Sequence, residues 1–241
     1  RRQRQMCIRD SFYQLHQEDA AEFLVSRLLN TEVCTHLAPR LTTLGADTLR
    51  CASCGHARQS TRAQFHSFQV PIEIEAAEFG ETIAIRDVQT AFDAYLADVM
   101  VPYELACEKC GNNHYKTNFC ATVFPQVLVL TLKRFKLVRL PSGAYDGPYG
   151  VNHPVETRQI LSFQGQSYRL RSVIVHVGTS VHAGHYFAVA RHDTDTGTWW
   201  LYNDGERREA TSEQVSAVGI WARSQEEMKS YVLFYEKRTT Q

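Results

Sequence analysis

The stretch "HAGHYFAVARHDTDTGTWWLYNDGE", residues 182–206, decides the fold because it predicts a β-hairpin with reactive groups at its open end. A first strand begins at His185, the turn carries Gly197, and a second strand rich in aromatic residues ends at Asn203 and Asp204. Strands that pair across this turn place the three polar side chains at the same end. A histidine whose second ring nitrogen is held by such an acceptor can act as a general base.

The other histidines near the hairpin receive a different interpretation. A single histidine in a strand is more often a hydrogen-bonded structural residue than a catalyst, and we assign His176, His182 and His192 to that class. His185 is set apart because Asn203 and Asp204 fall at the matching end of the partner strand.

The segments around the hairpin predict more strands. "QVLVLTLKRF" (126–135) is a nearly continuous apolar run with β-branched residues, which is typical of a strand buried on both faces. Further strands are predicted at 168–178 and 231–237, and short alternating stretches lie within 46–75. "LPSGAYDGPYG" (140–150) is rich in proline and glycine and predicts a loop.

Two helices are predicted earlier in the chain. Between residues 17 and 29 apolar residues recur at three- and four-residue steps, and the acidic residues Glu18 and Asp19 fall in the first turn. The apolar face of this helix comprises Ala20, Phe23, Leu24 and Leu28. A second helix is predicted over 87–100, and the order of helices and strands indicates an α+β fold.

Composition and charge limit the class of protein. Lys+Arg and Asp+Glu number 26 each, so no net charge favours nucleic acid or an anionic membrane as a partner. No apolar run approaches the roughly 18 residues of a spanning helix, and no signal-peptide pattern opens the chain. We therefore expect no nucleic-acid and no membrane partner, and an intracellular location in the cytoplasm or nucleus.

Four of the seven cysteines form two C-x-x-C pairs, Cys51 with Cys54 and Cys107 with Cys110. Two such pairs suit a structural zinc ribbon, in which four thiolates close a tetrahedron and leave no open position. Free thiols or a lost metal are the alternative, and His56 and His114 are expected to face solvent. Because many zinc ribbons bind nucleic acid, that function is a further hypothesis, although no concentrated Lys/Arg stripe supports it.

Several motifs in order along the chain resemble those of the ubiquitin-specific proteases. "VIVHVGTSVHAGHYFAVAR" (173–191) with "WWLYND" (199–204) resembles their histidine box. "QEDAAEFL" (17–24) resembles their Gln-Asp-Ala-x-Glu-Phe segment, and "VLVLTLKRF" (127–135) resembles their central strand. The two cysteine pairs fall where that family carries zinc-bound fingers. The resemblance covers nearly the whole chain, from about Gln14 to Lys237.

The resemblance implies a papain-like cysteine peptidase fold with a β-rich palm, zinc-ribbon fingers and a largely truncated thumb. Residues 12–237 would form a partial catalytic domain, with a residual thumb helix in 12–45, fingers in 46–114 and the palm in 115–237. The implied partners are ubiquitin and ubiquitinated proteins. The implied activity is thiol-dependent hydrolysis of the isopeptide bond after the terminal glycine of ubiquitin.

Roles follow from the resemblance at matching positions. His185 would be the general base, Asn203 would orient it, and Asp204 would assist by polarising the oxyanion site. The residues implied to contact ubiquitin lie beside the groove for its tail (Gln17, Asp19 and Glu22) or line the channel for its Gly-Gly terminus (Gly184 and Tyr186). The residues implied to hold structural zinc are Cys51, Cys54, Cys107 and Cys110.

The nucleophile of the family has no counterpart in the sequence. The motif Gly-Leu-x-Asn-x-Gly-Asn-x-Cys-Tyr is not found, and Cys7 has no helix start or imidazolium partner to lower the pKa of its thiol. Cys34 and Cys120 are expected to be buried. "MCIRDS" (6–11) resembles the translation of a transposon-end sequence used in sequencing libraries, so residues 1–11 are expected to be non-native.

Two hypotheses remain for the chain. It is either a fragment of an active deubiquitinase whose nucleophile-bearing part is missing, or a pseudoenzyme that binds ubiquitin without cleaving it. We favour the fragment, because both His185 and Asn203 are kept. In either case the chain as given is expected to be inactive.

Overall fold

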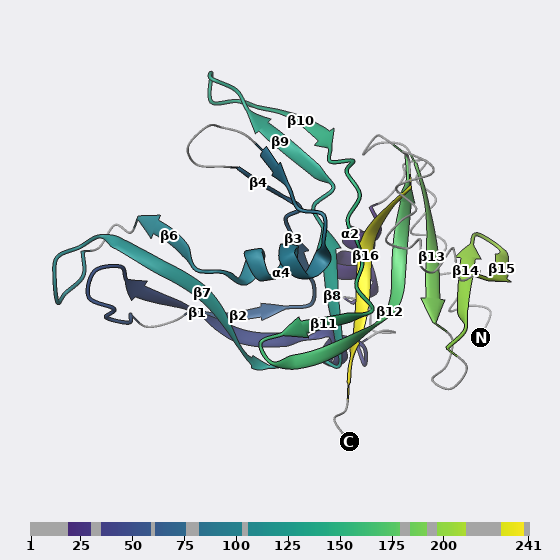
Figure 1. Ribbon diagram of the computed structural model, residues 1–241, viewed down its shortest axis with the longest axis horizontal. Helices are drawn as coiled ribbons and strands as arrows, with labels where there is room; N and C mark the ends of the chain where they lie inside the picture. Colours follow the sequence, from purple (N-terminus) through teal and green to yellow (C-terminus); the bar gives the residue numbers. More distant parts are fainter. Residues whose placement is uncertain are drawn as a thin grey trace.

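The computed structural model describes most of the chain and is built mainly of β-strands around one central sheet (Figure 1). The described residues are 19–29, 35–58, 61–75, 82–102, 106–178, 184–191, 197–210 and 228–238. Among them no helix is long and apolar enough to cross a membrane.

The central sheet, which we call the palm, has eight strands in the order β15-β14-β13-β12-β16-β8-β3, with β11 paired to β12. The strands are β3 (Phe68–Val70), β8 (Val127–Leu132), β11 (Ile160–Phe163), β12 (Gln166–Val177), β13 (His185–Arg191), β14 (Trp199–Asn203), β15 (Glu206–Glu209) and β16 (Met228–Lys237). All neighbours are antiparallel except β3 and β8. The predicted hairpin is confirmed, because β13 pairs with β14 from Ala188 opposite Tyr202 to Arg191 opposite Trp199.

The palm is covered on both faces, and β8 shows why its sequence is apolar throughout. Leu128, Leu130 and Leu132 belong to the main core, whereas Val129 belongs to a second core on the other face. All four side chains are at most 1% exposed. The prediction of a strand buried on both faces is therefore confirmed, although the strand ends at Leu132 and not at 135.

The second core lies under the helix predicted for 17–29, which differs in detail from the prediction. Asp19 is the N-cap and not a first-turn residue, α2 spans Ala20–Glu22, and a π-helical segment η1 spans Phe23–Leu28. In this segment the Leu29 N–H donates to the Leu24 carbonyl at 3.1 Å, a five-residue step. That step adds Leu29 to the buried face, which also holds Ala21 and Leu24. Of the expected stripe, Leu24 is buried and Ala20 and Leu28 pack against this core half-buried. A short helix α3 (Ala38–Leu41) follows.

A separate four-stranded sheet, which we call the fingers, extends away from the palm (Figure 1). Its order is β2-β1-β7-β6, with β1 (Thr43–Cys51), β2 (Thr61–Phe65), β6 (Val99–Pro102) and β7 (His114–Val123). Both cysteine pairs lie toward its outer end, since Cys51 ends β1 and pairs with Tyr115 of β7. The sheet includes residues on both sides of the predicted boundary at 114.

Two small hairpins complete the strands. β4 (Glu73–Glu75) pairs with β5 (Thr82–Ala84), and β9 (Phe135–Arg139) pairs with β10 (Tyr145–Gly150). The segment 140–150 was predicted as a loop, and this prediction is wrong for residues 145–150, which form an exposed strand. The hairpins are joined where Lys136 of β9 forms an ion pair with Glu73 of β4 at 2.6 Å.

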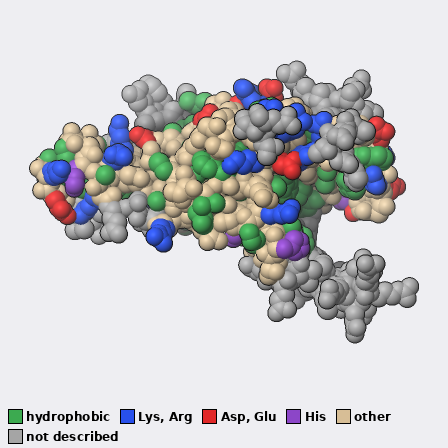
Figure 2. Space-filling view, turned by 90° about the horizontal axis from the view of Figure 1, so that it is seen from below, with side chains coloured by type: hydrophobic (Ala, Val, Ile, Leu, Met, Phe, Trp, Pro, Cys, Tyr) green, Lys and Arg blue, Asp and Glu red, His purple; other side chains and the backbone are tan. Residues whose placement is uncertain are grey.

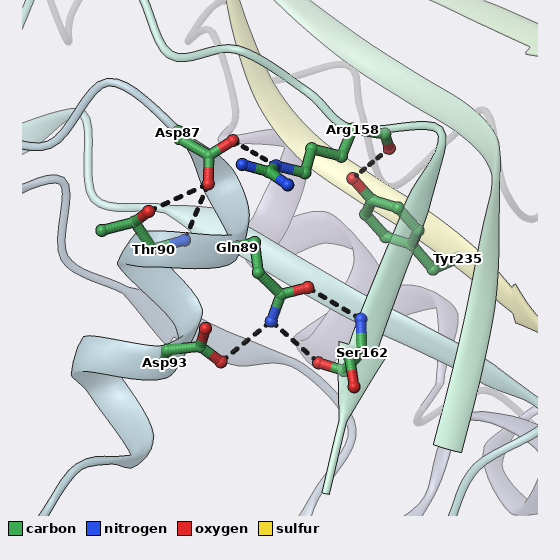
Figure 3. Close-up of polar contacts among 7 residues, drawn as sticks. All are labelled: Asp87, Gln89, Thr90, Asp93, Arg158, Ser162 and Tyr235. Atoms are coloured by element: carbon green, nitrogen blue, oxygen red, sulfur yellow. Dashed lines mark hydrogen bonds and ion pairs between the residues drawn. The ribbon is translucent and has the colours of Figure 1, made fainter. Parts of the chain in front are cut away.

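Helix α4 (Val88–Leu96) covers the main core and is tied to the palm by polar contacts (Figure 3). Asp87 caps the helix by accepting from the Thr90 N–H at 2.9 Å, and it also accepts from Arg158 Nε at 2.6 Å. The Gln89 amide bonds the Ser162 N–H and carbonyl at 2.7 and 3.0 Å. The helix ends at Leu96 and not at 100, because the chain turns into β6 at Val99.

On the face drawn in Figure 2, acidic and basic side chains of the described residues lie interspersed along the elongated molecule. This mixture agrees with the equal totals of the two signs in the sequence. Among the described residues on that face, no extended surface of a single sign is formed.

We expect Asp87→Ala to lower the free energy of unfolding by about 1–2 kcal/mol, because the substitution removes a helix cap together with its bond to Arg158. Denaturant titration followed by circular dichroism measures the loss. The control is Asp93→Ala on the same helix, whose carboxylate accepts from the exposed Gln89 amide. A loss in the Asp93 variant as large as in the Asp87 variant would contradict the assignment.

The loss of stability in Asp87→Ala should depend on pH. Burial raises the pKa of Asp87, but the bonds from Arg158 and Thr90 outweigh it, so that the pKa lies below its usual value. A lowered folded pKa gives stability that is present above the unfolded value of about 3.9 and is lost as the pH falls through the folded pKa. The difference between wild type and Asp87→Ala should therefore shrink in unfolding measurements below about pH 4.

Candidate functional site

The site lies at the end of the palm where β13 begins and β14 ends. His185 is the first residue of β13 and Asn203 the last residue of β14, and the Nε2 of His185 contacts the Oδ1 of Asn203. The predicted convergence of these side chains is confirmed. Because an amide oxygen only accepts hydrogen bonds, Nε2 carries the proton and Nδ1 is left as the basic nitrogen. The His185 side chain is 44% exposed, so a reactant can reach it.

Asp204 follows at the turn between β14 and β15. Its Oδ2 lies 3.9 Å from the Nε2 of His185, and its side chain is 81% exposed. That distance is too long for a hydrogen bond, so the carboxylate acts on the ring only through its charge. Asp204 adopts a left-handed backbone with φ 51°, which few residues other than glycine, asparagine and aspartate accept readily.

Behind His185 the chain is packed against a second histidine. His176 is 4% exposed, and its ring lies 4.9 Å from that of Tyr186. Burial lowers the pKa of His176, and the nearby Lys229 ammonium lowers it further. His176 is therefore a neutral packing residue, in agreement with its structural assignment. Gly184 lies directly against it, because a Cβ on Gly184 would meet the His176 ring and the Val177 carbonyl.

Asp19 joins the thumb helix, the name used here for α2 and η1, to the palm beside this site. Its Oδ1 accepts from the Ala21 and Glu22 N–H groups at 2.9 Å each, and its Oδ2 accepts from the Tyr231 hydroxyl at 2.6 Å. The Tyr186 hydroxyl lies 3.5 Å from the same Oδ2. Burial together with this carboxylate raises the pKa of Tyr186 to about 12, so the phenol remains a donor.

Tyr231 was missed by the sequence analysis. It lies within the predicted strand 231–237, but no sequence signal connects it with residue 19. Both oxygens of Asp19 are used inside the protein, and this role was not anticipated from the sequence. Glu22 is exposed beside the cap.

A cluster of four thiols lies in the fingers. The Sγ atoms of Cys51, Cys54, Cys107 and Cys110 all lie within 4.8 Å of one another. Two of these sulfur pairs, Cys51 with Cys110 and Cys54 with Cys107, are 3.4 and 3.6 Å apart. The Cys54 backbone N–H is the largest cause that lowers the pKa of the Cys51 thiol to about 6. The four residues are thus candidates to hold a metal ion.

Each cysteine pair is carried by the same kind of turn. The Gly55 N–H donates to the Cys51 carbonyl at 2.9 Å, and the Gly111 N–H donates to the Cys107 carbonyl at 2.8 Å. The two glycines have φ of 70° and 74°, a conformation that a side chain would strain. His56 and His114 do not belong to the cluster.

Comparison with known proteins identifies the family. The family model described as ubiquitin carboxyl-terminal hydrolase matches residues 3–235. The chain belongs to this family. It is 28% identical over 196 residues to human ubiquitin carboxyl-terminal hydrolase 21, a match that covers 78% of this chain and 31% of the relative. It is 26% identical over 249 residues to ubiquitin carboxyl-terminal hydrolase 36 of Drosophila simulans, covering 91% of this chain and 22% of the relative.

Solved structures share the fold of this hydrolase-family chain. The SAGA DUB module Ubp8/Sgf11/Sus1/Sgf73 bound to monoubiquitin matches with a TM-score of 0.71 and 20% identity, over 97% of this chain and 51% of that chain. The same module bound to ubiquitin aldehyde matches with a TM-score of 0.69 and 19% identity, over 94% and 50%. The family and the papain-like α+β fold expected from the sequence are confirmed. The chain spans about a third or less of the curated relatives and about half of these solved chains.

Five residues discussed in the sequence analysis lie outside the described residues. These are Gln17, Cys7, Cys34, His182 and His192. Cys120 was expected to be buried, but it is exposed on β7 because its side chain points away from the core side occupied by Phe119. Among the described residues no cysteine contacts His185.

We expect Gly184→Ala to lower the free energy of unfolding by about 1–3 kcal/mol, because the added methyl group overpacks the buried His176. It should also shift the imidazole NMR signals of His185 and His176. The control is Gly205→Ala on the other side of the site, where a Cβ would meet nothing within 4 Å. Equal stability of the two variants would show that the close approach at Gly184 has no cost.

Proposed function

We propose that this chain is the palm and fingers of a deubiquitinating cysteine protease and that His185 serves as its general base. The observation that carries the proposal is the contact between the His185 Nε2 and the Asn203 Oδ1. It fixes the tautomer and leaves Nδ1 free to take a proton. Asn203 then orients the ring, and the Asp204 carboxylate stabilises the imidazolium that forms.

The proposed reaction begins with attack of a thiolate on the isopeptide carbonyl after the terminal glycine of ubiquitin. An acyl-enzyme forms, the amine leaves with a proton from His185, and water activated by His185 then releases the ubiquitin tail. The thiolate is supplied by a cysteine other than those described. Four of the described thiols form the cluster in the fingers, and Cys120 lies on β7 of the fingers sheet.

Ubiquitin is the proposed partner of the palm and fingers. Support comes from the structures of this fold that are bound to monoubiquitin and to ubiquitin aldehyde. Gly184 and Tyr186 flank His185 in the chain and would line the passage for the tail. A residue larger than glycine at 184 collides with His176. Asp19 would contribute by holding Tyr186 and the thumb helix in place, with Glu22 exposed beside it.

The metal proposed for the fingers is zinc. Four thiolates at about 2.3 Å from a tetrahedral zinc ion are separated from one another by roughly 3.8 Å. The sulfur separations of 3.4 and 3.6 Å, with all four atoms within 4.8 Å, fit that geometry. A site closed by four sulfurs is structural. Such unpaired thiols suit an intracellular location, in the cytoplasm or the nucleus.

A ubiquitin-binding pseudoenzyme is the second candidate. It is favoured by one observation, namely that no cysteine of the described residues contacts His185. The upstream coding sequence separates the two candidates, because an Asn-x-Gly-Asn-x-Cys motif there identifies a fragment of an active enzyme.

We expect the purified chain to contain one zinc ion, measured by plasma mass spectrometry. Cys54→Ser or Cys107→Ser should abolish zinc retention, because three thiolates leave the tetrahedron open. Cys120→Ser serves as the control, since Cys120 is exposed and outside the cluster. Full zinc content in the Cys54 and Cys107 variants would rule out this site.

We expect the chain to bind ubiquitin in isothermal titration calorimetry and to release no fluorophore from a ubiquitin–fluorophore conjugate. Turnover that Cys7→Ala abolishes would identify Cys7 as the nucleophile and contradict the expectation that the chain as given is inactive. Failure of the folded chain to bind ubiquitin at concentrations of several hundred micromolar would remove ubiquitin as the partner.

A further inference from the structure

The turn between β11 and β12 contains a residue in an unfavourable conformation. Phe163 pairs with Gln166, so that Gln164 and Gly165 form a two-residue turn with φ of 45° and 83°. Two positive φ angles at these positions are typical of a type I′ turn, which favours asparagine, aspartate or glycine. A glutamine in this region strains its backbone, and a residue held in this way requires a compensating contact.

The Gln164 side chain reaches across to the fingers. Its Nε2 donates to the Phe119 carbonyl at 2.6 Å, and its Oε1 accepts from the Ala121 N–H at 2.9 Å. The amide thus pairs with β7 as a neighbouring strand would. Within the described part of the chain, this edge of β7 is paired with β6 from His114 to Thr117. Beyond the end of that pairing, the Gln164 side chain supplies the hydrogen bonds to this edge.

The contact falls beside an irregularity in the fingers sheet. The pairing of β1 with β7 is irregular between Leu44 and Gly45, and Gly45 lies opposite Ala121. A Cβ on Gly45 would meet the Cys120 carbonyl and the Phe119 ring, so only glycine fits between the two strands at this position. A bulge bends and twists the strand that carries it. A restraint on β7 at Ala121 therefore acts at the bend itself.

A small rotation at this bend moves the far end of the fingers substantially. From Ala121 to Tyr115, which pairs with Cys51, β7 is about 20 Å long at roughly 3.4 Å per residue. A tilt of about 10° at Ala121 displaces the metal-site end by about 3.5 Å over that length. A displacement of this size is enough to disrupt the fit between the fingers and a folded protein bound to them. The aromatic contacts of Phe119 with Phe65 and Phe68 hold the root together, but they are less directional than hydrogen bonds.

We propose that Gln164 is a positioning residue that sets the angle of the fingers on the palm and thereby the affinity for folded ubiquitin. The proposal takes its ligand, ubiquitin, from the proposed function. It deepens that function by distinguishing recognition of the globular body of ubiquitin from recognition of its tail. The globular body of ubiquitin requires the fingers at a set angle. Its tail requires only the passage beside His185, which Gln164 does not touch.

A second glutamine provides a matched control. Gln89 of α4 makes the same two-point amide contact, with the N–H and carbonyl of Ser162 at 2.7 and 3.0 Å (Figure 3). It bonds the same strand, β11, but from a helix of the palm and with no contact to the fingers. Gln89→Ala therefore removes the same two bonds to a strand backbone, together with one bond to Asp93, without releasing β7.

The test uses the 241-residue chain with Gln164→Gly, Gln164→Asn and Gln89→Ala. Glycine relieves the strain of the turn, whereas asparagine tolerates it but is one methylene too short to reach β7. We expect both Gln164 variants to bind ubiquitin about tenfold more weakly in calorimetry, equivalent to about 1.4 kcal/mol. Their affinity for a peptide of the last six residues of ubiquitin, followed by NMR, should stay within twofold of wild type. Gln89→Ala should match wild type for both ligands.

Residual dipolar couplings of backbone amides supply a readout that lost stability alone does not move. In wild type the fingers and palm should fit one common alignment tensor, and in both Gln164 variants they should not. Unchanged ubiquitin affinity with one common tensor in the Gln164 variants would overturn the proposal, as would an equal loss of ubiquitin affinity in Gln89→Ala. If wild type itself fails to bind ubiquitin, the proposed function fails, and the dipolar couplings alone decide the role of Gln164.

Discussion

The antiparallel pairing of β13 with β14 is the interaction on which the site depends. With Ala188 opposite Tyr202 and Val189 opposite Leu201, the end of β14 lies beside the start of β13. A register shift of one residue would send the Asn203 side chain to the other face of the sheet. The register is held by burial, because Val189 and Leu201 are in the main core. The contact between His185 and Asn203 is thus stabilised by apolar side chains that take no part in chemistry.

The surroundings of His185 are fixed by a second constraint, the carboxylate of Asp19. One oxygen closes the start of the thumb helix and the other binds Tyr231 of β16, with the Tyr186 hydroxyl nearby. A single charged group therefore connects a helix to two strands of the palm. Tyr231 is buried and Tyr186 half-buried, and hydrogen bonds to a charged group are stronger than those between neutral groups. Tyr186 directly follows His185, so this connection also restrains the start of β13.

The sequence predicted those parts of the structure that depend on local pattern. The hairpin, the doubly buried β8 and the cysteine pairs could be predicted because alternation, apolar runs and C-x-x-C spacing are local signals. The π-helical step at Leu24 and Leu29 could not, since an ordinary 3.6-residue period was assumed and packing on β16 decided otherwise. β10 was missed because its glycines and proline are typical of loops. The partners of Asp19 and Gln164 depend on residues distant in sequence, for which one chain gives no local signal.

Two glutamine side-chain amides bond strand edges where a neighbouring strand would otherwise pair. Gln89 and Gln164 each bond a backbone N–H and a carbonyl, the first at the outer edge of β11 and the second at the free edge of β7. An unpaired strand edge is open to wrong partners, and an amide covers it without adding chain. The two contacts differ in consequence because β11 lies within the palm, whereas β7 leaves it. The cysteine cluster and His185 belong to different sheets. The position of the fingers and the surroundings of the histidine can therefore vary independently, connected through the root of β7.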